Sequence, residues 1–353
     1  MTTAQIDDET PAGNSRWQRL APIFTLIVFA PGIAEVMSGA TRLSFIFVFI
    51  PEMMVWGCGA LIIRDLVRRW QGGWTIIFLL GLALSIAEEF VIQQTSLAPF
   101  PWASASDYGR VWGVNWIWFL FFLGFESVLV VLVPVQLTEL IFPSRRNHPW
   151  LKQSGLLVSS IVFLIGSFIA WFLWIKIARA KVLHVPPYQP PFLAIFSGIV
   201  LIVILAIAAC ALRNVGNRYA VRASTTVPSP WIAGIVTLLF GFPWYALMAL
   251  IFGPRRDLPL WIPVLAAAFW ACLAYVVAHW FTSSPVWSDL HRWSAVSCAT
   301  LVCMIAGFLG SSAWSLTDIV AKAILNVLAV AGFIWLALKI SRRAPATVRC
   351  HSS

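Results

Sequence analysis

The feature that most restricts the fold of this chain is a series of apolar runs, which recurs from Leu20 to Ile340. Each run has roughly 20 residues, the length that a helix needs to cross ~30 Å of hydrocarbon. The runs are continuously apolar rather than alternating, which disfavours a β-barrel. Only 11% of the residues are charged, whereas a soluble domain carries about a quarter. The sequence therefore predicts an all-α, polytopic membrane helical bundle with about ten transmembrane helices.

The ends of the predicted spans are given to within about three residues. They are 20–39, 43–63, 74–94, 114–136, 155–177, 192–212, 231–252, 260–281, 293–314 and 316–340. The fourth span has two alternatives: it continues to Phe142 as a longer tilted helix, or it breaks at Pro134. Residues 1–16 and 341–353 read as polar and basic tails around one bundle at 17–340, with 17–222 and 231–340 as candidate sub-units.

Lys and Arg determine the predicted orientation. Most of the 24 Lys and Arg fall in segments that face the cytoplasm when the N-terminus is inside, and such segments collect cations in membrane proteins. We therefore expect a multi-pass protein of the cell membrane (plasma or inner membrane) with both termini cytoplasmic. The same rule explains the net charge of +10, so we expect the lipid bilayer as a partner and no nucleic acid.

Acidic residues inside the apolar runs are the strongest functional signal. With the predicted orientation and a rise of about 1.5 Å per residue, five of them lie between the outer interface and roughly the midplane. These acids are Glu35, Glu52, Glu88, Glu89 and Glu126. Carboxylates at this depth are costly unless a charge, a proton or water meets them. Glu139 lies near the inner end of its span and is expected to stand apart.

Helical spacing predicts that some of these acids share a face. Ser85, Glu89, Gln93 and Ser96 form a polar stripe on one helix, with Glu88 about 100° away from it. On the fourth span, Asn115, Phe119, Phe122 and Glu126 form a similar stripe. Pro31 and Pro51 closely precede Glu35 and Glu52, and a proline inside a membrane helix frees a backbone carbonyl that can become a ligand.

The last span offers a cationic counterpart. Asp318, Lys322 and Asn326 repeat at intervals of four residues, which places them on one helix face. A lysine at this depth is expected to pair with membrane carboxylates, or to lose its proton when a cation binds. The alternative is structural: Asp318 and Lys322 form a local ion pair, and protonated glutamates hydrogen-bond between helices.

Metal and cofactor signals are weak. Five of the six cysteines lie in apolar runs without CxxC spacing, which favours neither a disulfide framework nor a zinc site. No His lies near the intramembrane acids, so no metal is predicted, and no cofactor or catalytic residue is assigned.

The stretch GLALSIAEEFVIQQ resembles the first motif of the CPBP family of intramembrane proteases, which includes the CAAX prenyl endopeptidases. Gln93 stands where that motif has an arginine, and Glu126 in Phe122-x-x-x-Glu126 stands where a second motif has a histidine. Lys322-x-x-x-Asn326 is similar to a third motif, His-x-x-x-Asn, but comes late in the chain. The resemblance implies glutamate-activated hydrolysis in the membrane, without the motif histidines.

The sequence supports three hypotheses. The first is a carrier that binds a proton, a cation or a cationic solute, with oligomeric state unknown. Its expected binding residues are Glu35, Glu52, Glu88, Glu89, Gln93, Glu126, Lys322 and Asn326. The second is a CPBP-like hydrolase, active or inactive, in which Glu88 or Glu89 activates water. The third is a non-catalytic membrane scaffold or partner subunit.

Overall fold

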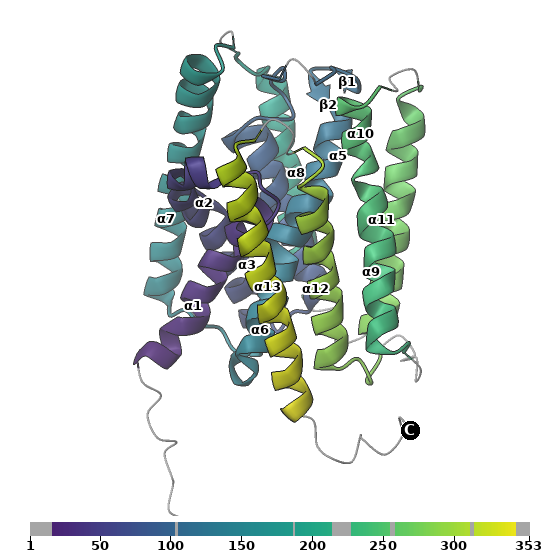
Figure 1. The fold of residues 1–353 in the computed structure, drawn as a ribbon. Helices are drawn as coiled ribbons and strands as arrows, with labels where there is room; N and C mark the ends of the chain where they lie inside the picture. Colours follow the sequence, from purple (N-terminus) through teal and green to yellow (C-terminus); the bar gives the residue numbers. More distant parts are fainter. Residues whose placement is uncertain are drawn as a thin grey trace, which may run out of the picture.

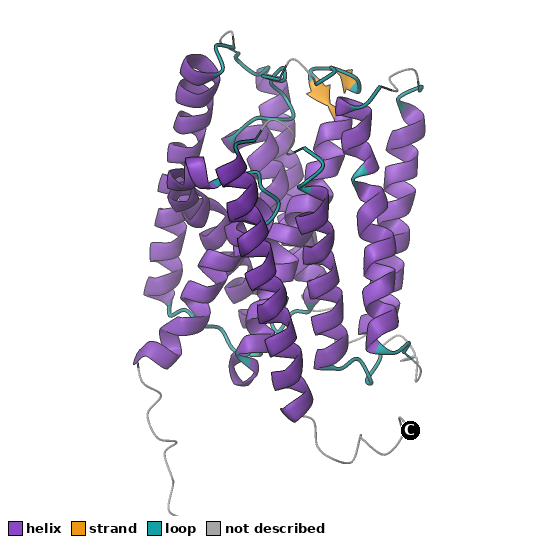
Figure 2. Ribbon diagram, viewed as in Figure 1, coloured by secondary structure: helices purple, strands orange, loops and turns teal. Residues whose placement is uncertain are grey.

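A computed structural model describes residues 16–102, 105–185, 188–213, 227–254, 258–310 and 314–343. Long helices run side by side in one bundle (Figures 1 and 2). The strands that the described residues contain, β1 (Arg110–Val111) and β2 (Val114–Asn115), form a short antiparallel hairpin at one end of the bundle. The predicted all-α class is confirmed.

The first four spans are built from several helical segments each. The first consists of α1 (Arg16–Pro31) and η1 (Gly32–Val36), and the second of η2 (Leu43–Val48), α2 (Phe49–Glu52), η3 (Met53–Gly57) and α3 (Cys58–Arg69). The third consists of α4 (Trp74–Ile86) and η4 (Ala87–Ile92), and the fourth of α5 (Trp116–Phe125), η5 (Glu126–Leu132) and α6 (Val133–Ile141), with the short η6 (Pro143–Arg145) after it.

The remaining helices form the later spans, and the first of these spans also contains a π-helical segment. They are α7 (Gln153–Trp171) with η7 (Phe172–Val182), α8 (Phe192–Leu212), α9 (Pro230–Trp244), α10 (Ala246–Phe252), α11 (Trp261–Thr282), α12 (Asp289–Ala306) and α13 (Leu316–Arg343). Nine helices of the described chain are long and apolar enough to cross a membrane. The further predicted span, 293–314, falls on α12, which has 18 residues, carries Asp289 and Arg292 in its first turn, and lies beside α13 (Figure 1).

The fourth span resolves the alternative at Pro134. It is one helix of 26 residues, Trp116–Ile141, so the longer helix is confirmed and Pro134 does not interrupt it. Pro134 is the second residue of α6, which begins directly after η5, so its missing backbone N–H falls where the regular α-helical ladder is already interrupted.

Wide π-helical turns interrupt the acid-bearing spans. Here a backbone N–H bonds to the carbonyl five residues earlier, as from Met37 to Gly32 (2.9 Å) and from Gln93 to Glu88 (2.9 Å). The turns η1, η3, η4 and η5 lie at, or directly after, the intramembrane acids of the four spans. Such turns are rare and concentrate at functional sites.

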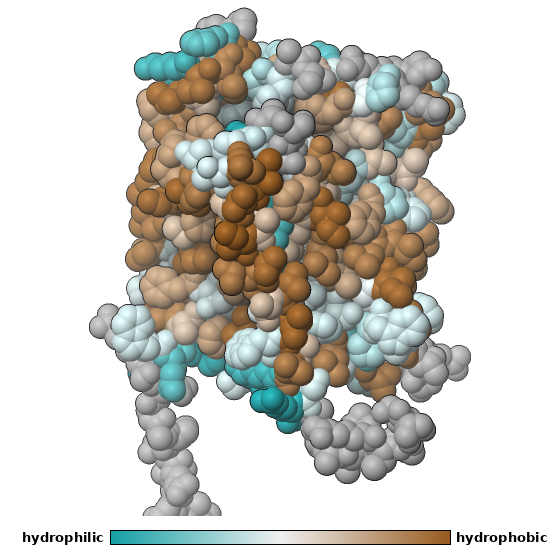
Figure 3. All heavy atoms as spheres, in the orientation of Figure 1, coloured by the Kyte–Doolittle hydropathy of each residue, from teal (hydrophilic) through white to brown (hydrophobic). Residues whose placement is uncertain are grey.

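The acid-bearing spans also form the centre of the bundle. Each span has a most apolar stretch, and the buried share of that stretch exceeds half in three spans. These are Leu43–Arg69 (56%), Trp74–Ile92 (67%) and Trp116–Ile141 (61%). The corresponding share is 11–22% in the spans from α7 onward and 33% in the first. The outer helices therefore present apolar side chains outward, as the brown surface in Figure 3 shows.

Close backbone contact holds the first two spans together. A Cβ added to Gly57 would lie 2.4 Å from the carbonyl oxygen of Ile27, so only glycine fits where η3 crosses α1. Small residues allow membrane helices to approach in this way.

Helix α1 begins and α13 ends at the same end of the bundle (Figure 1). This matches the predicted arrangement of the termini, whereas their cytoplasmic location stays a prediction. Most of both tails and much of the expected linker between sub-units lie outside the described residues, while α13 continues into the expected C-terminal tail as far as Arg343. Helix α12 of the second candidate sub-unit packs against α6 and η1 of the first.

Candidate functional site

The structure brings together five acids from four separate spans, and we refer to Glu35, Glu52, Glu88, Glu89 and Glu126 as the acidic cluster. The carboxyl group of Glu88 lies within electrostatic range of those of Glu35 and Glu52, and of its neighbour Glu89. The carboxyl group of Glu126 lies within range of Glu88 and Glu89, and also of Glu35. The predicted convergence of these acids is therefore present in the fold.

The acidic cluster lies in the interior of the bundle. The exposed fraction is 2% for Glu88 and Glu89, 5% for Glu126 and 6% for Glu52, while Glu35 is half-buried. Contacts between η1, η3, η5 and α4 enclose it. Burial of this kind favours the neutral form of a carboxyl group unless a cation accompanies it.

Glu88 is the least satisfied member of the acidic cluster. Neither carboxyl oxygen has a hydrogen-bond partner within the described chain. An ionised carboxylate in this setting would cost several kcal/mol, and the surrounding groups are themselves acids. Glu88 is therefore suited to hold a proton or to meet a cationic ligand.

Glu89 has a contrasting environment. Its Oε2 accepts hydrogen bonds from the hydroxyls of Thr95 (2.6 Å) and Ser96 (2.5 Å). The chain reaches this position because η4 ends at Ile92 and Gln94 adopts a left-handed conformation (φ +59°), which turns the next residues back toward the helix. The predicted helical stripe is wrong at Ser96, which contacts Glu89 from beyond the helix end.

Two more hydroxyl groups accompany the acidic cluster. The Thr41 hydroxyl donates to Oε1 of Glu52, whose other oxygen has no partner in the described part of the chain. The Ser85 hydroxyl lies beside Glu126. Sequence reasoning missed Thr41 and Thr95 as neighbours of these acids, and the available signal was their position in the short loops directly after η1 and η4.

On the fourth span, Asn115 is not part of the site. Its Oδ1 accepts from the backbone N–H of Trp118 (3.0 Å), and its Nδ2 donates to the carbonyl oxygen of Tyr108 (3.1 Å). Asn115 therefore caps the N-terminus of α5, and the stripe predicted from Asn115 to Glu126 combines a helix cap with a member of the acidic cluster.

Lys322 does not pair with the acidic cluster in the described residues. Its Nζ donates to the backbone carbonyls of Met37 and Met304, the latter at 3.1 Å, and lies 4.4 Å from the ring centroid of Phe308. Met37 follows η1 and Met304 belongs to the last turn of α12. The carbonyls at helix C-termini lack intrahelical partners and attract cations, so Lys322 acts as a cap shared by two helices.

The neighbours of Lys322 on the same helix face also differ from expectation. Asp318 accepts from the backbone N–H and hydroxyl of Ser44 (both 3.0 Å) and from Ser315 (2.9 Å), rather than from Lys322. Asn326 is 7% exposed, and both polar atoms of its side chain have no partner in the described part. Gln93 is half-buried and terminates η4.

Glu139 belongs to a separate ionic network at the end of the bundle where α13 ends, which the sequence predicts to be the inner end. We call Arg64, Asp65, Arg68, Arg69 and Glu139 the inner-end ionic network. Glu139 pairs with Arg64 (3.1 Å) and Arg68 (2.8 Å), while Asp65 pairs with Arg69 (2.8 Å). Asp65 also accepts the backbone N–H groups of Trp150 (2.7 Å) and Leu151 (3.0 Å). The expected separation of Glu139 from the other acids is therefore present.

In the described part of the chain, no three His, Cys, Asp or Glu side chains are placed to hold a metal ion. The acids of the cluster influence one another electrostatically without forming a compact set of ligands. What the arrangement can do chemically is take up, share and release protons, or receive a cation after a rearrangement of the side chains.

A family profile described as "Uncharacterized membrane protein family" matches residues 24–348. The chain belongs to this membrane protein family. No curated protein and no solved structure matches it. Family membership agrees with the predicted multi-pass membrane protein, while the resemblance to the CPBP proteases stays a prediction. Of the residues that carry that resemblance, Glu88, Glu89 and Glu126 come together, whereas Lys322 caps two helices.

Proposed function

We propose that this multi-pass membrane protein is a carrier that couples solute movement to protonation of the acidic cluster. The observation that carries the proposal is Glu88: both of its carboxyl oxygens are buried and unpartnered in the described chain, and the charged groups around it are acids from three other spans. Ionisable residues inside the membrane mark ion pathways and proton relays.

The chemistry favours the proton over a bare metal cation as the coupling ion. A protonated carboxyl group is neutral and can donate a hydrogen bond to a neighbouring acid, so several acids can share one dry site. When more than one is ionised, they repel one another and require water or a cation. A cationic solute would supply the same neutralisation, which gives a physical basis for exchanging protons for solute.

The surrounding backbone can support a change of access. Pro31 and Pro51 and the wide turns η1, η3, η4 and η5 interrupt the regular helical ladder around the acidic cluster. Discontinuous helices near a central site occur in transporters that open alternately to the two sides. We propose that the protonated cluster favours a closed bundle, and that ionised acids favour a state open to water.

Proton flux is the first test. Purified protein is reconstituted in liposomes that contain a pH-sensitive dye, and uptake is measured under an imposed membrane potential with Na⁺, K⁺ or tetraethylammonium present. We expect flux in the wild type and a loss of about a hundredfold or more in Glu88→Gln, as for the removal of a positioned proton-transfer group. Asp107→Asn, which changes an exposed acid outside the cluster, should retain flux.

A second measurement does not depend on the solute. Infrared difference spectroscopy across a pH titration should show a protonated-carboxyl carbonyl band in the wild type that weakens in Glu88→Gln and persists in Asp107→Asn. Flux equal to that of protein-free liposomes, together with an unchanged band in Glu88→Gln, would overturn the proposal. Turnover of a peptide or lipid without flux would favour the hydrolase alternative.

A further inference from the structure

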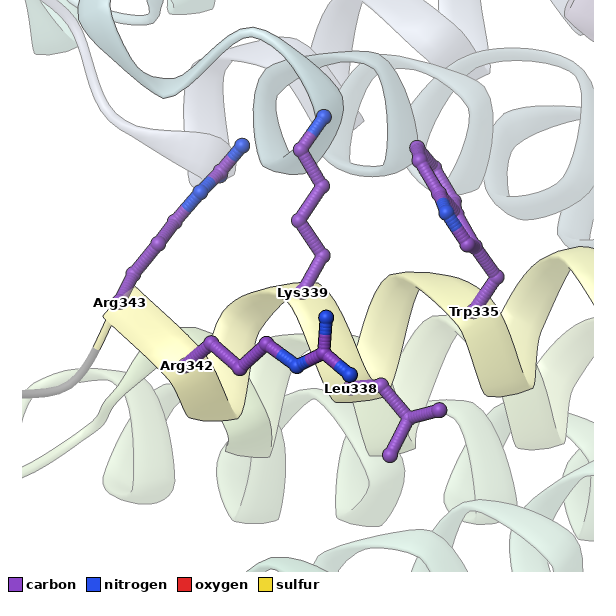
Figure 4. A pocket seen from close by; sticks show the side chains of 5 residues that line it. All are labelled: Trp335, Leu338, Lys339, Arg342 and Arg343. Carbon is purple, nitrogen blue, oxygen red and sulfur yellow. The ribbon is translucent and has the colours of Figure 1, made fainter.

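The inner end of α13 carries a basic hollow that is separate from the acidic cluster. Trp335, Leu338, Lys339, Arg342 and Arg343 line a cavity of about 310 Å³. Trp335, Lys339 and Arg343 follow one another at intervals of four residues and project from the same side of the helix, with Leu338 and Arg342 alongside (Figure 4). We call these five side chains the basic hollow.

The basic hollow has positive charge without a matching acid. None of the five ion pairs in the described chain includes Lys339, Arg342 or Arg343. The neighbouring Glu139 is already held by two other arginines. Lys339 Nζ lies 4.7 Å from the ring centroid of Trp335, and Arg343 donates to the carbonyl oxygen of Leu140 (3.4 Å). Arg342 is exposed, and its planar guanidinium has paired N–H donors that match the geometry of a phosphate group.

The surface above the basic hollow is apolar. Val327, Leu328, Ile334, Trp335 and Leu338 are each at least 54% exposed, and they continue along α13 toward the middle of the bundle. In Figure 3 this ridge of brown side chains ends in teal ones at its lower end. An acyl chain can lie along such a surface while a charged headgroup reaches the end of the helix.

From this juxtaposition we infer that the basic hollow binds the headgroup phosphate of an anionic phospholipid, with the acyl chains against the exposed face of α13. The volume is at the lower limit for small-molecule sites, which suits a headgroup rather than a whole lipid. Three cations match an anionic headgroup, and Trp335 provides the interfacial aromatic contact. A basic segment that only fixed the orientation of the chain would need no hollow and no selectivity among lipids.

Lipid retention tests the inference. Protein in detergent is titrated with phosphatidylglycerol, or with phosphatidylcholine of the same acyl chains, and bound lipid is counted by native mass spectrometry. We expect phosphatidylglycerol to be retained preferentially. Each of Lys339→Gln, Arg342→Gln and Arg343→Gln should reduce that preference about fivefold, and the triple variant should abolish it.

Matched controls remove cations elsewhere at the same end of the bundle: Lys152→Gln before α7 and Arg213→Gln after α8. They should leave the preference unchanged. Equal retention of the two lipids, or an equal loss in the controls, would overturn the inference. So would complete competition by glycerol 3-phosphate at the concentration of the lipid, because it would show a site for a soluble phosphate instead. None of these outcomes depends on proton flux through the acidic cluster, so this inference and the proposed function can fail separately.

Discussion

Two buried sets of charged groups differ in how they are satisfied. In the inner-end ionic network, acids and arginines pair with one another, and Arg64 also donates to three backbone carbonyls and stacks 3.6 Å above the Trp150 ring. In the acidic cluster, the neighbouring charged groups are other acids, and the carboxyl group of Glu88 has no hydrogen-bond partner in the described chain. The first set is arranged to keep one charge state. In the proposed function the second set changes its charge state, so we assign the proposed function to the acidic cluster and a stabilising role to the network.

The largest effect is expected from Glu139→Gln. This change leaves the fully buried guanidinium of Arg64 without its carboxylate, and removal of one partner from a buried pair costs about 3–5 kcal/mol. Thermal denaturation in detergent should show a lower midpoint for this variant. If Glu139→Gln is no less stable than Glu88→Gln, the distinction between the two sets of charges fails.

Asp65→Asn should have the next largest effect. Asp65 holds the backbone of Trp150 and Leu151 as well as Arg69, and an amide cannot accept all of these bonds. We expect a loss of about 2–3 kcal/mol, since a charged hydrogen bond is lost and a buried donor is left unpaired. The same denaturation assay measures it. Asp107→Asn is the control, and an equal loss there would contradict the role of Asp65.

Lys322→Met tests a buried cation near the acidic cluster, away from the inner-end ionic network. Loss of the ammonium leaves the carbonyls of Met37 and Met304 without their donor, which should cost about 1–2 kcal/mol. Because Lys322 is a cap rather than a member of the acidic cluster, proton flux per folded molecule should be retained. Full loss of flux with unchanged stability would instead return Lys322 to the site.

The smallest stability effect is expected from Glu88→Gln. The amide has nearly the same shape as a protonated carboxyl group, and the carboxyl oxygens of Glu88 have no hydrogen bond in the described chain to be lost. The free energy of unfolding should change by less than about 1 kcal/mol, while the flux described above is lost. A large destabilisation would show that Glu88 is structural.

The helical bundle was predictable because continuous apolar runs of membrane-spanning length have few alternatives. The grouping of Glu35, Glu52, Glu88, Glu89 and Glu126 was predictable as well, since an isolated carboxylate is too costly in this environment. The position of Lys322 was not, because a spacing of four residues shows which residues share a helix face but not which carbonyls that face meets. The same limit applies to Glu89, whose hydroxyl partners depend on where η4 ends.

The number of residues in the wide turn η4 determines how its side chains are oriented. A π-helical turn contains one residue more than an α-helical turn, so deletion of a single residue within Ala87–Ile92 would allow the segment to close as regular α-helix. The chain beyond it would keep nearly the same direction, because a π-helical turn and an α-helical turn each complete one full circle, whereas the side chains inside the turn would point in new directions. The extra residue of η4 therefore determines the directions of Glu88 and Glu89 rather than the path of the chain toward Thr95 and Ser96.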